Sequence, residues 1–482
     1  MDADRLPAAF LREMRTLLGN EYDAYIESLK EPWKPGLRLN GLKLEPKEFE
    51  KMVPWNLEPV PWEAAGFYYD PEAVRPSRHP WYYAGLYYLQ EPSAMAPAAF
   101  LPIEPGDRVL DLCAAPGGKS TALAAKLRGT GLLVSNDISY SRARALLKNL
   151  ELAGAANVCV VSESPEKLSG PWTEFFDKIL VDAPCSGEGM FRPEEGMVRD
   201  WEKRGPAYYA PLQREILVQA VRMLRPGGQL LYSTCTFSRL EDEGNVEFLL
   251  QTCPELELVP LDADRAPGAV SGIHLPGVLR FFPHRVKGEG HFLALLKKRG
   301  GALIRPAGEL GPDSRKGGAL EREELESREP KGGGMSFRRK KNGERLGELG
   351  EFLGRCGLAW EPEQVFISGE NVYLLPQGLA TGLPFRFLRT GLLLGQLKKG
   401  RFEPSQALAM ALGRDGFSDC RNLDLEDERV LRYLKGETIP LKPEESAAKG
   451  WQLVQCGGYS LGWAKGAGAS LKNKYYPGWR WQ

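Results

Sequence analysis

RVLDLCAAPGGKST, residues 108–121, joins the end of an apolar strand to the start of a helix. Its small residues and paired glycines allow the backbone to approach a ligand closely, and the helix N-terminus offers free N–H donors to a carboxylate. A phosphate-binding P-loop would need glycine where Cys113 stands, and the dinucleotide motif G-x-G-x-x-G is absent. The alternative is an ordinary tight turn without a ligand. We favour a ligand-binding loop.

Further apolar stretches alternate with helical patterns downstream of this loop. The strand-like stretches are LLVSND (132–137), NVCVVSES (157–164), DKILVDAP (177–184) and QLLYSTCTF (229–237), and the helical patterns cover 119–127, 141–152 and 212–224. Such alternation predicts an α/β fold with a doubly wound, parallel sheet. Ligands of these sheets bind at the carboxyl ends of the strands, which is where the polar motifs of this sequence fall.

The 482 residues are too many for one hydrophobic core. Residues 1–80 begin with helical periodicity and continue into proline-punctuated segments, which predicts a small α+β module before the doubly wound domain at 81–298. Residues 299–345 are rich in glycine and charge, which indicates a linker. Apolar patterning returns in 346–482, enough for one or two further domains.

The overall composition is that of a soluble globular protein, with 43% apolar and 26% charged residues. The net charge is zero, so only local patches can indicate a polyanionic partner. No run approaches the roughly 20 apolar residues that cross a bilayer, and the N-terminus is too charged for a secretory signal. We expect a cytoplasmic monomer. The eight cysteines form no C-x-x-C pair and the four histidines lack ligand spacing, so we expect neither disulfides nor a metal site.

Three polar residues follow predicted strands. Asp137 ends the second strand, where a carboxylate can accept both hydroxyls of a ribose; its alternative role is a helix cap. Cys185 lies in DAPCSGEGMFR (182–192) and Cys235 in YSTCTFSRLEDEGNVEF (232–248), both directly after a strand. Either thiol alone is more typical of an inert buried side chain. Two thiols at adjacent strand ends, each beside a serine or threonine, favour a chemical role.

The motifs DLCAAPGGKST, DAPCSGEG and STCTF, in this order and spacing, resemble the Nop/Sun family of RNA cytosine-5 methyltransferases. The DAPCSGEGMFR form and the length are most similar to its bacterial RsmF-type ribosomal RNA enzymes. The resemblance covers most of the chain. It implies a Rossmann-like methyltransferase domain, a small RsmF-specific domain at 346–400 and a PUA-like RNA-binding domain at 401–482. It also implies S-adenosylmethionine as cofactor, and ribosomal RNA or the small ribosomal subunit as partner.

The resemblance implies a role for each motif residue. Asp137 would hold the ribose, and Asp182 would lie beside the cofactor and the target base. Relatives have an aspartate near the adenine where this chain reads SESP; Ser164 fits its position after the strand and is our predicted contact, while Glu163 fits the spacing to Asp182. The methionine end of the cofactor would be wrapped by Cys113, Ala114, Ala115, Pro116, Gly117, Gly118 and Lys119.

The two cysteines suit the chemistry of this family. C5 of cytosine is a poor nucleophile, and a thiolate that adds to C6 makes C5 able to attack a methyl sulfonium. A free cysteine has a pKa of about 8.5, so the site must favour the thiolate. The residues alone leave open which cysteine attacks. The resemblance implies that Cys235 is the nucleophile and that Cys185 helps to release the product.

The C-terminal residues 461–482 combine cations with aromatic rings and contain no acid, a mixture that suits RNA. The alternative is a C-terminal strand whose aromatic rings pack in a core, and we expect some of these rings to do so. The cations are Lys465, Lys472, Lys474 and Arg480, and the rings are Trp463, Tyr475, Tyr476, Trp479 and Trp481. RRKK (338–341) is a second candidate phosphate contact, although such runs are typical of solvated linkers.

The sequence is also compatible with other functions. The acceptor could be DNA or transfer RNA instead, and the basic, aromatic C-terminus favours structured RNA. A non-catalytic ribosome-assembly factor would be expected to lack a motif cysteine or the glycine-rich loop, and this chain retains both. C6 of a paired cytosine is shielded, so the target must be unpaired or flipped out of its helix.

Overall fold

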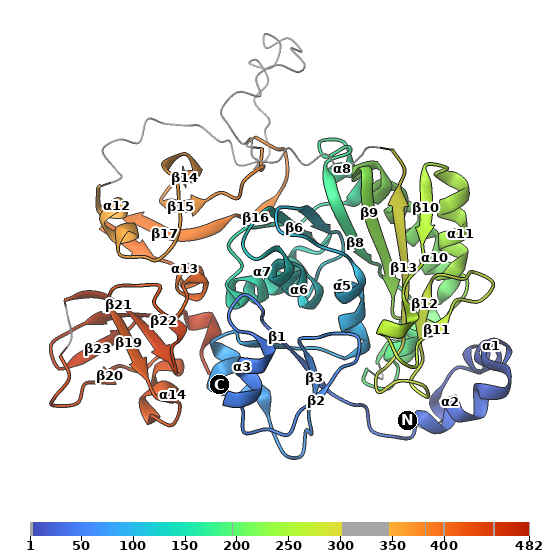
Figure 1. The fold of residues 1–482 in the computed structure, drawn as a ribbon, viewed down its shortest axis with the longest axis horizontal. Coiled ribbons are helices and arrows are strands. Elements are labelled where there is room, and N and C mark those ends of the chain that lie inside the picture. The colour runs from blue at the N-terminus through green and yellow to red at the C-terminus, as the bar shows by residue number, and fades with distance from the viewer. Residues whose placement is uncertain are drawn as a thin grey trace, which may run out of the picture.

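The structure is a computed structural model that describes residues 3–194, 196–300, 347–380, 382–398, 401–446 and 449–481. The RRKK cluster and almost all of the predicted linker lie outside these residues. A ten-stranded sheet forms the centre of the molecule (Figure 1). Its strands, in spatial order, are β11 (Val270–Ser271), β12 (Leu279–Phe281), β13 (His291–Lys298), β9 (Leu224–Thr234), β8 (Phe176–Asp182), β5 (Arg108–Asp111), β6 (Leu132–Asn136), β7 (Val158–Val161) and β16 (Phe387–Thr390), and β10 (Leu256–Val259) also pairs with β13.

The central strands of this sheet confirm the predicted doubly wound fold. β7, β6, β5, β8 and β9 pair in parallel, and both faces are covered by helices, which explains why these strands are almost continuously apolar. One face packs against α5 (Ala96–Phe100), α6 (Gly118–Leu127) and α7 (Tyr140–Ala153), and the other against α8 (Pro165–Ser169), α10 (Pro206–Met223) and α11 (Glu243–Thr252). The short α9 (Gly196–Lys203) precedes α10. No helix among the described residues is long and apolar enough to cross a membrane.

The register of β8 and β9 decides where the motifs meet. Asp182 pairs with Ser233 at the carboxyl ends of these strands, and Cys185 and Cys235 follow within three residues. The antiparallel neighbour β13 brings Phe292 opposite Thr234, so the start of β13 reaches the same edge. Three segments that are far apart in sequence therefore converge there.

An N-terminal α+β module covers one side of this edge, as predicted. Its antiparallel sheet has the order β2 (Glu58–Pro59), β3 (Gly66–Tyr68), β1 (Gly36–Leu39) and β4 (Tyr87–Leu89), with α3 (Pro46–Met52) and α4 (Pro80–Tyr83) beside it. Helices α1 (Ala8–Leu18) and α2 (Tyr22–Ser28) do not pack on this small sheet but against the segments that follow β8 and β9. There the rings of Phe10 and Phe191 meet edge to face, with centroids 5.0 Å apart.

Two smaller sheets follow the linker. The first contains β14 (Val365–Ser368), β15 (Asn371–Leu374), β17 (Leu392–Lys398) and β18 (Arg401–Pro404), with α12 (Gly347–Gly354) beside it. The second has the order β19 (Cys420–Leu423), β21 (Gly450–Cys456), β22 (Tyr459–Gly466), β23 (Ser470–Asn473) and β20 (Ile439–Pro440), with α13 (Gln406–Ala411) and α14 (Glu428–Leu434). Trp463, Tyr475 and Trp479 are buried, which confirms that some of the C-terminal rings belong to a core.

Strand β16 ties the C-terminal part to the central sheet. It lies within the segment 346–400, yet it pairs antiparallel with β7, where Thr390 stands opposite Cys159. The sequence FLRT gives no sign of this pairing, because a four-residue strand on a sheet edge needs no distinctive pattern.

A buried ion cluster fixes the segment between β9 and α11, which begins with Cys235. Arg280 on β12 is 1% exposed; its Nε lies 2.7 Å from Glu243 Oε1, and its guanidinium lies 3.1 Å from Asp242 Oδ2. A second guanidinium N–H donates to the carbonyl oxygen of Phe237 at 2.9 Å. Arg280 thus binds both the loop after Cys235 and the start of α11.

We predict that Arg280→Met destabilises the protein strongly, because it leaves two buried carboxylates without their cation. Breaking a buried ion pair from one side costs about 3–5 kcal/mol, which denaturant unfolding would measure. Arg285→Met is the matched control: Arg285 pairs with Glu21 at the surface, where a pair contributes under about 1 kcal/mol. Equal losses of unfolding free energy in both variants would contradict this account.

Candidate active site

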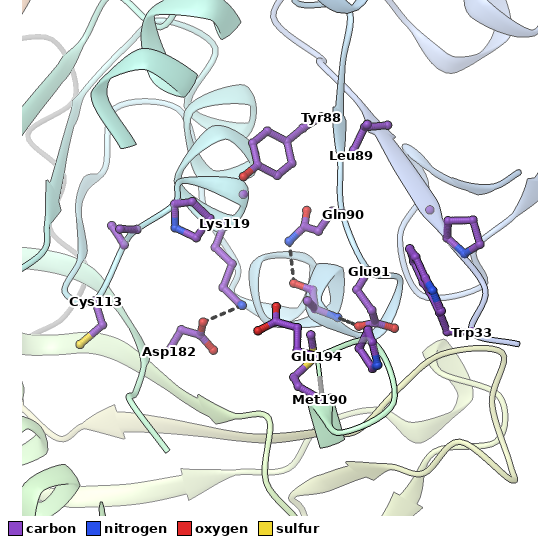
Figure 2. Close-up of a pocket in the computed structure, with 18 of the residues that line it drawn as sticks. Trp33, Tyr88, Leu89, Gln90, Glu91, Cys113, Lys119, Asp182, Met190 and Glu194 are labelled. Carbon is purple, nitrogen blue, oxygen red and sulfur yellow. Dashed lines mark hydrogen bonds and ion pairs between the residues drawn. The ribbon is translucent and has the colours of Figure 1, made fainter. Parts of the chain in front are cut away.

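The carboxyl ends of β5 and β8 open onto a cavity of about 560 Å³ (Figure 2). The loop 111–119 and Asp182 form one wall. The N-terminal module supplies the other, from which Trp33, Tyr88 and Gln90 face the cavity, and Met190 and Glu194 close it between the two. The cavity is therefore shared between the two domains, and aromatic rings stand opposite the glycine-rich loop.

The two glycines of the loop are required by its geometry. Gly117 has a φ of +112°, in the left-handed region, immediately before α6 begins. A Cβ on Gly118 would lie 3.0 Å from the ring of Tyr88 and 3.1 Å from the Gln90 amide nitrogen. The loop is further held by Arg38 of β1, whose buried guanidinium donates to the carbonyl oxygen of Gly118 at 2.6 Å. The N-terminal module thus holds the loop from outside the doubly wound domain.

Asp111 lies at the base of the loop and is fully buried. Ser120 Oγ donates to its Oδ2 at 2.6 Å, whereas Oδ1 has no hydrogen-bond partner among the described residues. Burial raises the pKa of Asp111 to about 7, with the bond from Ser120 opposing the shift. The cavity therefore has a carboxyl oxygen that is available to a donor.

Asp182 lines the cavity at the end of β8, and its carboxylate contacts three other side chains. Lys119 Nζ lies 2.7 Å from its Oδ2, Ser233 Oγ donates to its Oδ1 at 2.8 Å, and His291 Nε2 is 3.7 Å from the same oxygen (Figure 2 shows the lysine contact). Burial alone would raise the pKa of Asp182, but the Lys119 ammonium and His291 outweigh it and hold the pKa below its usual range. Asp182 is therefore an anion. No cluster of metal-ligating side chains occurs in the described parts of the chain.

The two motif cysteines meet next to this carboxylate. Their Sγ atoms are 3.4 Å apart; Cys185 is buried, and Cys235 is partly exposed. The hydrogen bond with Cys235, together with burial, raises the pKa of Cys185 well above its usual value. Burial likewise raises the pKa of the Cys113 thiol. Cys185 is therefore a buried thiol whose surroundings favour the protonated form.

Glu241 holds the loops that carry the two cysteines. Its carboxylate accepts from the backbone N–H of Ser186 at 3.0 Å and from Thr236 Oγ1 at 3.2 Å, and Ser186 Oγ lies 2.7 Å from Thr236 Oγ1. Gln213 of α10 donates to Glu241 at 2.7 Å and to the carbonyl oxygen of Pro184 at 2.9 Å. The residues directly after both cysteines are thus bound by one buried carboxylate, which fixes the separation of the thiols.

The predicted site residues fall into two groups in the structure. The cavity is lined by Cys113, Ala114, Ala115, Pro116, Gly118, Lys119 and Asp182. Gly117, Asp137, Ser164, Cys185 and Cys235 lie outside this lining. Asp137 accepts from the Ser139 backbone N–H at 2.9 Å and pairs with Arg142 at 3.3 Å.

The two candidates for the adenine contact are engaged elsewhere. Ser164 is the N-cap of α8, and its hydroxyl accepts from the backbone N–H of Lys167. The Glu163 carboxylate accepts from the backbone N–H of Arg386 at 2.6 Å, across the boundary to the C-terminal segment.

Sequence reasoning missed several residues of the site. His291 is 3% exposed, neither ring nitrogen has a hydrogen bond among the described residues, and it lies beside Asp182. Trp33, Tyr69 and Tyr88 come from the N-terminal module, and their only signal is an aromatic residue among prolines and short strands. The stretch LEDEG contained Glu241, but nothing in its pattern separates a buried acid from the exposed acids of a helix start.

Four family models of known proteins together match nearly the whole chain. A family model described as 16S rRNA methyltransferase RsmB/F matches residues 98–297, and one for the N-terminal domain of 16S rRNA methyltransferase RsmF matches residues 6–92. The RsmF first C-terminal domain matches residues 351–412, and the RsmF PUA domain matches residues 420–481. The curated ribosomal RNA small subunit methyltransferase F of Enterobacter sp. is 31% identical, over 97% of this chain and 95% of its own.

The chain belongs to the ribosomal RNA small subunit methyltransferase F family. A second member, from Serratia proteamaculans, is 32% identical over the same shares of both chains. The resemblance found in the sequence is thus confirmed, as are the Rossmann-like methyltransferase domain and the C-terminal PUA domain of this RNA methyltransferase family. A solved methyltransferase homologue from Pyrococcus horikoshii is 29% identical, covers 62% of this chain and all of its own, and has a TM-score of 0.54.

We predict that Asp111 makes stability depend on pH. Between about pH 4 and pH 7 the folded protein keeps a proton on Asp111 that the unfolded chain has released, so its contribution to stability falls as the pH rises through about 7. Asp111→Asn removes this contribution, and the fall in unfolding free energy across the window should shrink by up to about 4 kcal/mol. Glu188 and Glu289 also have raised pKa values but titrate in both proteins. An unchanged pH slope in the variant would refute the assignment.

Proposed function

We propose that this protein transfers a methyl group from S-adenosylmethionine to C5 of a cytosine in small-subunit ribosomal RNA, through a covalent bond between Cys235 and C6. The observation that carries the proposal is the contact between the Cys235 and Cys185 thiols, on the loops that follow β9 and β8. Strand β8 ends at Asp182, which lines the same cavity as the glycine-rich loop. Its relatives are ribosomal RNA methyltransferases by name, which supports ribosomal RNA as the substrate.

The residues present fit S-adenosylmethionine. The ten-residue helix α6 begins at the loop that lines the cavity, where its free N–H groups suit a carboxylate, and Asp111 in its ionised form would pair with an ammonium group. Residues 113–119 would hold the methionine part, Asp137 the ribose hydroxyls and Ser164 the adenine side. The cofactor, when bound, supplies the electrophilic methyl group that C5 accepts.

The surroundings of the two thiols support Cys235 as the nucleophile. Cys185 is buried and its pKa is raised by the hydrogen bond with Cys235 and by burial, whereas Cys235 is the more exposed thiol and can be reached by a base. The hydrogen bond stabilises the negative charge that the attack requires. The buried Glu241 keeps Cys185 in place. The protein environment thus favours the order that the family resemblance implies.

The proposed reaction uses the protein residues as follows. The Cys235 thiolate forms an S–C6 bond, and the ring electrons move to C5, which would take the methyl group as its bond to the sulfonium sulfur breaks and a neutral thioether leaves. Loss of the C5 proton to a base then restores the C5=C6 double bond and expels the Cys235 thiolate. Cys185 helps to release the thiolate. Asp182, which Lys119 holds as an anion, lies beside the target cytosine. The cytosine must leave its helix to reach the thiol.

We predict that Cys235→Ala abolishes methylation, because it removes the thiol that forms the bond to C6. The measurement is transfer of labelled methyl groups to ribosomal RNA or small subunits, followed by mapping of 5-methylcytosine. Cys420→Ala, which removes an exposed C-terminal thiol, is the control and should retain full activity. Normal methylation by Cys235→Ala would exclude it as the nucleophile.

For Cys185→Ala we predict that the reaction stops after attack and that a protein–RNA adduct accumulates on denaturing gels. The double variant Cys185→Ala/Cys235→Ala should form no adduct, because it lacks the attacking thiol. Normal turnover by Cys185→Ala without an adduct would remove its role in release.

A further inference from the structure

A second cavity, of about 720 Å³, lies between α7 and the C-terminal sheets. One wall is a single face of α7, with Ser141, Arg144 and Lys148 spaced three or four residues apart. The opposite wall consists of β17, β18 and the loop after β23, with Trp451, Lys474 and Tyr476. We call this cavity the interdomain cleft. Figure 1 shows α7 beside the orange C-terminal strands.

The interdomain cleft has an excess of positive charge that the described residues leave unneutralised. Arg144, Lys148 and Lys474 are exposed, and none has a carboxylate partner among the residues that the structure describes. The acids that line the cleft are already paired, Glu151 with Arg389 and Glu403 with Lys398. The free charges of the cleft are therefore all cations, contributed by both walls.

Further cations gather at the C-terminal wall. Lys465 Nζ lies 4.2 Å from the ring centroid of Trp451. Burial lowers the pKa of Lys465, and the nearby cations Lys474, Arg401 and Lys472 lower it further, against the opposing effect of Glu403. Cations that repel one another without matching acids are stabilised by a polyanion.

The aromatic side chains of the interdomain cleft indicate which polyanion fits. Tyr476 is 55% exposed, unlike its buried neighbours Tyr475 and Trp479, and Trp451 is partly exposed. Cations beside accessible rings bind phosphates while unpaired bases stack on the rings. A duplex keeps its bases stacked inside and could not use these faces.

We propose that the interdomain cleft binds a single-stranded segment of the RNA substrate, with Arg144 and Lys148 at phosphates on one wall and Lys474 and Tyr476 at phosphate and base on the other. This inference rests on the proposed function in taking RNA as the substrate. The cleft begins close to the cofactor loop, because Arg142, next to Ser141, donates to the carbonyl oxygen of Ala115 at 2.9 Å. RNA held there would run along α7 toward the active site.

The test is equilibrium binding of a labelled short single-stranded RNA of mixed sequence to the full chain at several salt concentrations. Arg144→Gln/Lys148→Gln should weaken binding about tenfold or more and reduce the slope of log K against log salt by roughly 1.4, which is ~0.7 for each of two phosphate contacts. Tyr476→Ala should weaken binding about tenfold with little change in that slope, since stacking carries no charge.

A matched control removes two cations elsewhere. Arg222 and Lys297 lie at the opposite end of the central sheet, near the start of β9, and Arg222→Gln/Lys297→Gln should leave affinity and slope unchanged. Wild-type binding by the α7 double variant, or a duplex that competes as well as the single strand, would overturn the inference. If the wild type binds RNA through the interdomain cleft but methylates none, the proposed function is wrong and the inference of RNA binding in the cleft is retained.

Discussion

The parallel pairing of β8 with β9 is the constraint on which the site depends. It sets Asp182 opposite Ser233, so that the loops with Cys185 and Cys235 leave the sheet side by side. Glu241 then binds the residue after each cysteine, and the thiols come to lie 3.4 Å apart. A shift of this register would separate the carboxylate from the thiols. The chemistry we propose thus follows from one set of backbone hydrogen bonds and one buried carboxylate.

The N-terminal module completes the site instead of merely preceding it. Arg38 holds the glycine-rich loop through the carbonyl oxygen of Gly118, and a side chain at position 118 would crowd the ring of Tyr88. The C-terminal part is tied in the same way, because β16 extends the central sheet beside β7. The methyltransferase domain therefore contacts both flanking parts directly, one through its glycine-rich loop and the other through its sheet. A single surface can then serve for cofactor, target base and the RNA that carries it.

Much of this arrangement was predictable because parallel strands bring their carboxyl ends to one edge. The alternation of apolar strands and helices therefore predicted that Cys113, Asp182, Cys185 and Cys235 would converge. The sequence could not reveal His291, because contact across antiparallel strands depends on register. Nor could it reveal that Trp33 and Tyr88 face the loop, since packing between domains follows no local periodicity. The family resemblance, and no pattern of the residues, implied that Cys235 attacks and that Cys185 acts in release. The raised pKa of the buried Cys185 supports this assignment.

The central claim is that Cys235 forms the bond to the cytosine. An RNA substrate with 5-fluorocytosine at the target position tests it most directly, because fluorine replaces the C5 proton whose loss releases the enzyme. After incubation with S-adenosylmethionine and digestion, mass spectrometry of the cross-linked peptide locates the modified residue. The account predicts the nucleotide on Cys235. A nucleotide on Cys185, or a substrate methylated without any covalent complex, would contradict it.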